Sequence, residues 1–494
     1  MVTNKSGEAP VAVRGDKISR AGRGALGLAR MFSRDPLETA LFVVLMAGLV
    51  WTPFWLGGNR VLPWGVNAVY FGLALLAYEV SLLWRGTGHA VGAKELVLPV
   101  ALFVGVCLWC VFQMSIWSPA GVQHPVWATA SDALGRALNG SISVDPDLSA
   151  LAFMRLLTGA SVFWLSLQLC RDSERAHWLL NGVGIAIAAY SAWGVVSLVF
   201  FSNAIFWFGA PDIGPWLRST FVNRNSFATY AGLGLVALVA VFLRLYRREG
   251  LDFSGSWKLG VVQFLEVSGR RGWIVMSACL VVLVALLLSG SRGGIMASGF
   301  GLFVLLMLAF RTRRRHASER VEAVVFIGAG IAACFLFFGD LFVGRISVFG
   351  VFDVNRWSVY MISIQSILDA PFLGFGYGTF MSIFPLYRDR SISVLGAWED
   401  AHNSYIEVFQ GLGLIGGSML VACVGYVVYL CFRGALRRQR SSAPCCVAVA
   451  ASCLVGAHAL VDFSLQIQAV TLTWLALLGA GAAQSISSRR TVGD

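Results

Sequence analysis

The sequence predicts an all-α polytopic membrane protein with about twelve transmembrane helices. Of its 494 residues, 57% are hydrophobic and only 13% are charged, whereas soluble proteins carry roughly 25% charged residues. Apolar runs of about 20 residues, each long enough to cross the hydrocarbon core of a bilayer, recur along the chain. A β-barrel is not expected, because the sequence lacks period-2 alternation between closely spaced turns.

The apolar runs divide the chain into one membrane domain with two tails. We expect spans at 37–58, 61–84, 96–117, 149–170, 178–201, 225–243, 273–289, 294–310, 321–339, 404–431, 445–462 and 469–486. Residues 1–36 then form a basic tail, 37–486 a single transmembrane domain and 487–494 a short second tail. The long loop at about 340–403 is rich in aromatic residues, so we expect it to form a cap of short helices.

The positions of the basic residues predict the orientation. If both termini are cytoplasmic, 28 Lys and Arg residues lie on the inner side and 9 on the outer side. The positive-inside rule favours this arrangement over its reverse. The net charge of +12 therefore reflects topology and contact with anionic lipid, and nucleic acid is not an expected partner.

His402 lies at the start of the tenth predicted span, in the stretch AHNSYIEVFQGLGLIGG. An imidazole at the membrane boundary can exchange a proton with a substrate from water while a buried helix holds its backbone. The alternative is that His402 only hydrogen-bonds the loop at a helix end. Either Asp400 or Asn403 could cap that helix.

Two arginines lie at the same predicted depth as His402. Arg224 begins the sixth span in TFVNRNSFATYAG, and Arg292 lies in LLLSGSRGGIMAS, in the turn between the seventh and eighth spans. Interfacial arginines often only reach toward lipid phosphates. An arginine on a glycine-rich turn can also make a bidentate contact with a substrate phosphate. The sequence leaves open whether these three residues converge.

Four further residues are candidates for substrate binding: Arg155 inside the fourth span, Arg356 in DVNRWSVY, Asn403, and Asp462 in HALVDFSLQ. A charge within a span is costly unless it is paired or functional, which applies to Arg155. The glycines of PFLGFGYGTF (371–380) are interpreted as turns in the cap. No DxD, HExxH or paired-carboxylate signature occurs on the outer side, so no metal site is predicted.

The ordered set of motifs resembles the O-antigen ligase and polymerase family of bacterial membrane glycosyltransferases. The resemblance rests on FVNRNSFATYAGLGL, LLLSGSRGG, RWSVYMISIQSILDAPFLGFGYGTF, the His402 stretch and HALVDFSLQIQA. These segments cover roughly the C-terminal half of the chain. The first four or five spans are only generically similar.

The resemblance implies a fold of the lipid-sugar glycosyltransferase (GT-C-like) kind in the bacterial inner membrane, with a periplasmic active site and no cofactor. The donor is a glycan linked to undecaprenyl diphosphate, and the acceptor is a hydroxyl of lipid A–core or of another glycan. His402 would be the general base, while Arg224 and Arg292 would stabilise the leaving diphosphate without a metal. Attack opposite the diphosphate would invert the anomeric configuration.

Three other functions stay open. A repeat-unit polymerase for O-antigen or exopolysaccharide differs from a ligase only in its acceptor, and transfer to a protein Ser or Thr is a further variant. A transporter or flippase of lipid-linked sugars belongs to another class. A transporter predicts polar groups near the bilayer midplane and often an internal repeat, whereas the strongest polar groups here lie at the outer boundary.

Overall fold

The computed structural model describes residues 31, 33, 35–205, 214–248, 257–311, 354–392, 398–438 and 442–486. Throughout these residues the regular elements are helices. The predicted ninth span, 321–339, lies outside the described residues, as do the first 30 residues of the predicted N-terminal tail and the whole C-terminal tail.

Fourteen longer helices are found in the described residues. The first half of the chain contains α2 (Pro36–Trp51), α3 (Val61–Arg85), α4 (Val97–Met114), α5 (Val126–Leu134), α6 (Pro146–Leu169), α7 (Ser173–Phe200) and α8 (Arg224–Arg248). The second half contains α9 (Trp257–Leu288), α10 (Arg292–Arg311), α12 (Val354–Asp369), α13 (Phe380–Tyr387), α14 (Ser404–Arg437), α15 (Ala443–His458) and α16 (Gln468–Ser485).

Eight helices in the described part are long and apolar enough to cross a membrane, and α2 and α15 are shorter apolar helices. The prediction of a polytopic α-helical membrane protein is thereby confirmed, whereas the number twelve and the GT-C architecture stay predictions. Two expected spans end early. The first span stops at Trp51, before a turn through Pro53 and the 3₁₀ helix Leu56–Gly58, in which Gly57 has a φ of 69°. The eleventh span stops at His458, so Asp462 lies in a loop.

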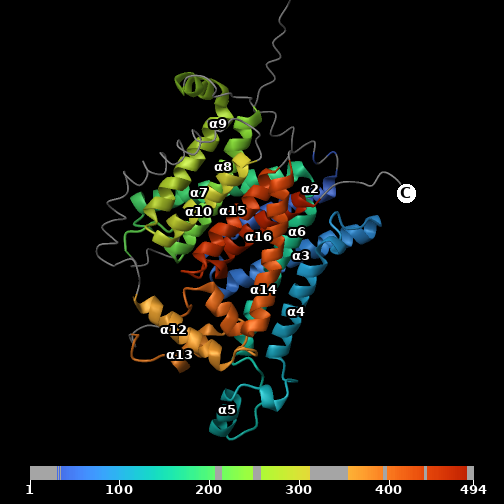
Figure 1. Cartoon of the computed structure of the whole chain (residues 1–494), viewed down its shortest axis with the longest axis vertical. Helices are drawn as coiled ribbons and strands as arrows, with labels where there is room; N and C mark the ends of the chain where they lie inside the picture. The colour runs from blue at the N-terminus through green and yellow to red at the C-terminus, as the bar shows by residue number, and fades with distance from the viewer. Residues whose placement is uncertain are drawn as a thin grey trace, which may run out of the picture.

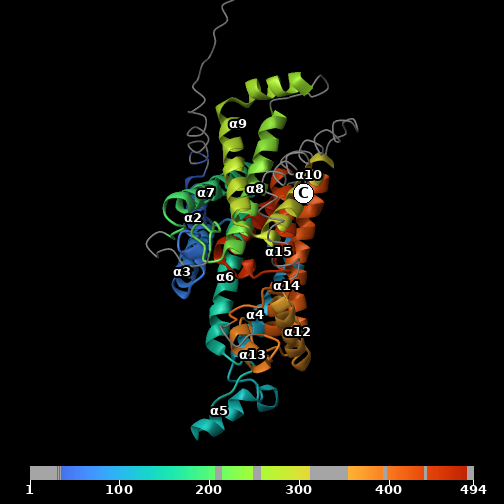
Figure 2. The ribbon, with the colours of Figure 1, turned by 90° about the vertical axis from the view of Figure 1, so that its left-hand side faces the viewer.

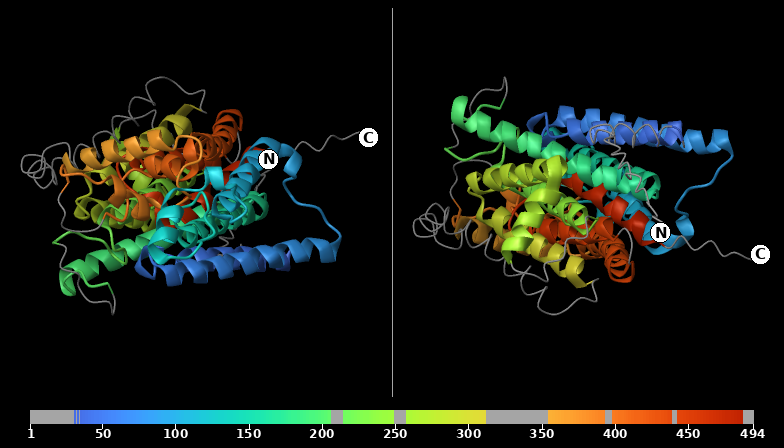
Figure 3. Two further views of the ribbon diagram at one scale, coloured as in Figure 1. Left: turned by 90° about the horizontal axis from the view of Figure 1, so that it is seen from below. Right: turned by 90° about the horizontal axis from the view of Figure 1, so that it is seen from above.

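The helix α16 forms the centre of the bundle and packs against α6, α14 and α15 (Figures 1 and 3). Its sequence is rich in alanine and glycine, and nearly all of its residues are buried. A Cβ on Gly481 would lie 2.2 Å from the Cβ of Ala448 in α15. Small residues therefore let the central helices approach closely, as is usual for helices packed in membranes.

The two ends of the bundle differ. The helices α12 and α13 lie at the same end as α5, and the first part of α9 lies at the opposite end (Figure 1). Gly269 breaks α9 with a φ of 49°, and the part before this break lies across the bundle axis (Figure 2). In the described part of the predicted cap, α12 and α13 are the helices, and Val359, Phe380, Phe384 and Ile392 belong to a small core against which Trp398 packs.

The cap is joined to α14 through backbone contacts at a kink. Gly413 interrupts α14 with a φ of 71°, and the Gln410 and Gly411 carbonyls just before it accept hydrogen bonds from the amides of Phe375 and Gly376 at 3.0 Å. Segment 371–380 therefore forms turns, as predicted, and these turns are packed directly on a helix. A kink exposes carbonyl groups that a straight helix would use internally.

Candidate active site

Asn403 begins α14 and fixes the direction in which the preceding residue points. Its side-chain oxygen accepts hydrogen bonds from the amides of Tyr405 and Ile406, at 3.1 and 3.2 Å, as an N-cap residue does. Its amide nitrogen donates to the Leu460 carbonyl at 3.0 Å. The structure thus selects Asn403 over Asp400 as the cap, and places His402 immediately outside the helix. A role for Asn403 in substrate binding stays a prediction.

The backbone of His402 has a left-handed conformation with a φ of 53°. For a residue other than glycine this costs of the order of 1–3 kcal/mol and persists only where neighbouring contacts enforce it. Here the Tyr360 hydroxyl donates to the His402 carbonyl at 2.9 Å, and the Ala401 amide donates to the Glu407 carboxylate at 2.7 Å. The carbonyl of His402 and the amide of the residue before it are therefore held.

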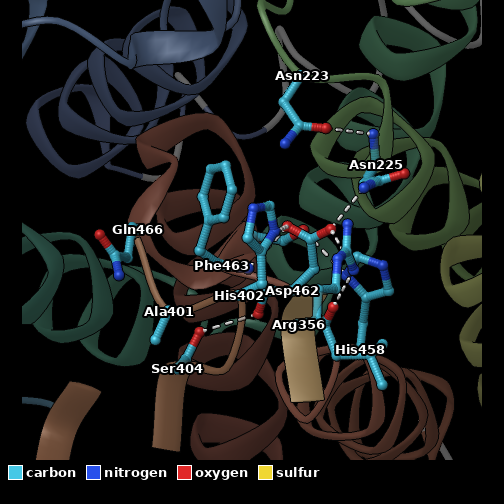
Figure 4. Close-up of polar contacts among 12 residues, drawn as sticks. Asn223, Asn225, Arg356, Ala401, His402, Ser404, His458, Asp462, Phe463 and Gln466 are labelled. Carbon is cyan, nitrogen blue, oxygen red and sulfur yellow. Dashed lines mark hydrogen bonds and ion pairs between the residues drawn. The ribbon is translucent and has the colours of Figure 1, made fainter. Parts of the chain in front are cut away.

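The His402 side chain faces Asp462 (Figure 4). Its Nδ1 lies 3.6 Å from Asp462 Oδ1, and the imidazole is 22% exposed. The ring of Phe463 meets the imidazole edge to face at 4.9 Å, and Trp398 does so at 5.8 Å. The aromatic neighbours restrict rotation of the imidazole, so that Nδ1 stays directed at the carboxylate.

Asp462 is the centre of the polar network drawn in Figure 4 and is 1% exposed. Its Oδ2 accepts a hydrogen bond from Asn225 Nδ2 at 2.5 Å, and its Oδ1 accepts one from the Phe463 amide at 2.8 Å. Burial by itself would raise the pKa of this carboxyl group, but His402 and the positive charge of Arg356 help to lower the pKa to about 2. Asp462 is therefore a carboxylate at neutral pH.

Arg356 comes from α12 and docks the cap on the loop after α15. Its Nη1 donates to the Val461 carbonyl at 2.7 Å and lies 3.8 Å from Asp462 Oδ2. The contact with the Val461 carbonyl gives this arginine a structural role in docking the cap. Contact with an anionic substrate stays a prediction.

Arg224 and Arg292 open two neighbouring helices, α8 and α10. The Arg224 guanidinium lies 5.3 Å from the ring of Trp216. That ring covers the turn between α9 and α10 so closely that a Cβ on Gly290 would come within 2.2 Å of it. Residues 289–291 form this turn, and Arg292 is the first residue of α10. The sequence had placed Arg292 within the turn, so the helix begins two residues earlier than expected.

The turn also abuts the segment around Asp462. A Cβ on Gly293 would lie 3.1 Å from Val461 and 3.3 Å from Nε2 of His458. The starts of α8, α10 and α14 therefore meet at the loop that follows α15. The sequence could not show this convergence, because the four segments are distant along the chain.

Arg155 lies on another side of the His402 loop. Its guanidinium stacks 4.3 Å above the ring of Trp64, and its Nη1 donates to the Gln466 carbonyl at 3.4 Å. The Gln466 amide donates in turn to the Glu407 carboxylate. The charge inside the span is thus accommodated by a cation–π contact and a polar chain that leads back toward His402.

Sequence reasoning missed several residues of this network. Asn225 directly follows Arg224, and His458 lies four residues before Asp462. Their closeness to these two candidate residues could have identified them from the sequence. His458 is buried, and its Nδ1 lies 2.8 Å from the Thr229 hydroxyl and 3.0 Å from that of Ser464. Tyr360, Glu407 and Gln466 gave no local signal, because their importance comes only from contacts made across the fold.

The arrangement combines a histidine, a buried carboxylate and cationic helix starts. A carboxylate at Nδ1 favours the tautomer that keeps the proton there and leaves Nε2 able to accept one. In the parts of the chain that the structure describes, no three His, Cys, Asp or Glu side chains are grouped so that they could hold a metal ion. The site is chemically suited to taking a proton from a hydroxyl near fixed positive charges.

Comparison with known proteins identifies one segment of the chain. Residues 277–421 match the model of a family described as O-antigen ligase. The match includes the turn with Arg292, the helices α12 and α13, and His402, whereas Arg224 and Asp462 lie outside it. No curated protein matches the chain. The family match confirms the resemblance that the ordered motifs predicted.

Proposed function

We propose that this chain, whose residues 277–421 match the O-antigen ligase family, is a ligase-type glycosyltransferase of surface polysaccharide synthesis. It moves a glycan from undecaprenyl diphosphate to a hydroxyl of lipid A–core at the periplasmic face of the inner membrane. The observation that carries the proposal is the His402–Asp462 pair at the meeting point of the helices that Arg224 and Arg292 begin.

His402 acts as the general base in this proposal. Nε2 takes the proton of the acceptor hydroxyl while the acceptor oxygen forms a bond to the anomeric carbon. Asp462, 3.6 Å from Nδ1, holds the imidazole in orientation and stabilises the imidazolium that forms. Attack from the side opposite the lipid diphosphate inverts the anomeric configuration.

The leaving group is the undecaprenyl diphosphate, whose negative charge grows as the glycosidic bond breaks. Arg224 and Arg292 are placed at the first positions of α8 and α10. At a helix start the helix dipole also favours an anion, so the side chains and the dipole act in the same direction. The two arginines then supply charge stabilisation that a divalent metal supplies in other glycosyltransferases.

The test is complementation of a bacterial strain that lacks this protein. His402→Ala and Arg292→Ala, with membrane expression confirmed, should lose the polysaccharide product seen on a gel. His89→Ala is the matched control, because His89 pairs with Glu79 outside the proposed site and should leave the product unchanged. A wild-type pattern from His402→Ala would exclude His402 as the base.

The same gel separates the related functions. If the inactive variants accumulate long undecaprenyl-linked chains together with bare core, the missing activity is that of a ligase. If they accumulate single repeat units on the core, the missing activity is that of a polymerase. Transfer by purified protein in detergent, with donor and acceptor supplied, would exclude a transporter, because a transporter needs a sealed membrane to show activity.

A further inference from the structure

Glu407 joins the two segments that carry His402 and Asp462. The residue lies in the first turn of α14. Its Oε1 accepts the hydrogen bond of the Ala401 amide at 2.7 Å, and its Oε2 accepts one from the Gln466 side chain. Ala401 directly precedes His402, and Gln466 lies one short turn after Asp462. A single carboxylate therefore contacts both loops of the pair.

The contact with Ala401 bears on the unusual backbone of His402. A φ of 53° is retained only where the surrounding contacts enforce it. The peptide after His402 is held by Tyr360, through the carbonyl. On the other side, Glu407 holds the Ala401 amide, which belongs to the peptide one residue further upstream. Without that acceptor, the backbone can rotate to a common conformation and carry the imidazole away from Asp462.

The contact with Gln466 ties this carboxylate to other helices. The Gln466 carbonyl accepts a hydrogen bond from Arg155 of α6 at 3.4 Å. Arg155 is stacked on Trp64 of α3 at 4.3 Å. The position of Glu407 is thus defined relative to α3 and α6 as well as to its own helix, which makes it a suitable fixed point for a loop.

We propose that Glu407 is a positioning residue that holds His402 against Asp462 by bonding the Ala401 amide and the Gln466 side chain. It acts through the backbone and does not contact the substrate. The inference rests on the proposed role of His402 as general base. It predicts that Glu407 affects kcat and does not affect the KM for the donor.

The test compares three variants of the full chain purified in detergent. The donor is undecaprenyl-linked glycan, and the acceptor is lipid A–core, both extracted from a strain that lacks the protein. Glu407→Ala removes both bonds. Glu407→Gln keeps an acceptor for Ala401, and it can also bond Gln466 once that side-chain amide flips. Gln410→Ala is the matched control, because it removes a buried hydrogen bond of 2.7 Å to Ser366 from the next turn of the same helix.

We expect Glu407→Ala to lower kcat by about 100-fold, the effect of misplacing a catalytic group by about 1 Å, with the KM for the donor unchanged. Glu407→Gln should keep kcat within a few-fold of wild type. Gln410→Ala should lower the unfolding temperature as much as Glu407→Ala does, but its kcat should be that of the wild type.

Three results would overturn the proposal. A wild-type kcat for Glu407→Ala would show that His402 does not need this contact. Equal loss of kcat in Glu407→Ala and Gln410→Ala would indicate a structural role only. Equal loss in Glu407→Ala and Glu407→Gln would indicate that Glu407 acts through its charge. Full activity of His402→Ala would instead contradict the proposed function itself, so the two failures are distinguishable.

Discussion

Asn225 donates a hydrogen bond to Asp462 at 2.5 Å and so links the first turn of α8 to the carboxylate that faces His402. Arg224 is the preceding residue, so the same contact fixes the helix start that carries the proposed diphosphate ligand. The proposed base and one proposed leaving-group ligand are thereby connected through the side chains of Asp462 and Asn225. This connection underlies the first prediction.

Asp462→Asn is expected to lower kcat by about 10²–10⁴-fold, the usual contribution of a positioned general base. The amide is neutral, so it no longer stabilises an imidazolium at His402. The KM for the donor should change little. Asp369→Asn, an exposed aspartate at the end of α12, is the control. Steady-state transfer kinetics check the prediction, and an unchanged kcat would remove Asp462 from the mechanism.

Arg292→Lys should separate bidentate recognition from positive charge. Lysine keeps the charge but lacks the planar fork that matches a phosphate, so we expect only partial recovery of the activity lost in Arg292→Ala. The loss in Arg292→Ala should be about 10²–10³-fold in kcat/KM, as for removal of one preorganised donor. Arg390→Ala, in an exposed segment of the cap, should retain activity. Full activity of the lysine variant would show that charge alone is sufficient.

Asp400→Asn should stabilise the fold above about pH 6, at neutral and alkaline pH, and not below pH 3.8. Burial is the main cause that raises the pKa of Asp400, from 3.8 to about 6. Below pH 3.8 this carboxyl group is protonated in both the folded and the unfolded state, so its burial has no effect through ionisation. As the pH rises through 6, the buried group must ionise, and the free energy of unfolding falls. The variant removes this cost, of the order of 1–3 kcal/mol.

The measurement for Asp400→Asn is the unfolding temperature in detergent at pH 4 and at pH 8. At pH 8 we expect the unfolding temperature of the variant to be higher than that of the wild type. At pH 4 or below, ionisation of Asp400 should cause no difference between the two proteins. The opposite pH dependence would mean that the native protein stabilises the ionised form of Asp400.

Gly413→Ala should destabilise the junction between the cap and α14. Gly413 has a φ of 71°, and a Cβ there would lie 2.4 Å from the Phe372 carbonyl oxygen. Backbone atoms cannot move aside as a flexible side chain can, so we expect a loss of about 3 kcal/mol or more. Gly425→Ala is the control on the same helix, because nothing lies within 4 Å of its added Cβ. Thermal unfolding compares the two variants, and equal unfolding temperatures would contradict the prediction.

Local features of the sequence were enough to predict much of the fold. Runs of apolar residues predicted helices close to α3, α6, α7, α8 and α10, because hydropathy and helix length depend on neighbouring residues only. A turn before α10 and the helix start after His402 were also correctly expected, although Arg292 and Gly293 belong to α10 and not to the turn. Helix ends were less accurate: the first and eleventh expected spans extend beyond Trp51 and His458, because apolar residues continue into the turns that follow.

The sequence by itself determined that the chain forms apolar helices and that Arg224, Arg292 and His402 lie at or next to the starts of three of them. Only the tertiary structure decided that Asp462 faces His402, that Asn403 and not Asp400 caps α14, and that Glu407 bonds both loops of the pair. The physical reason is that hydropathy and capping act over a few residues, whereas these contacts join segments far apart in the chain. Their proximity depends on how small residues let α14, α15 and α16 pack against one another.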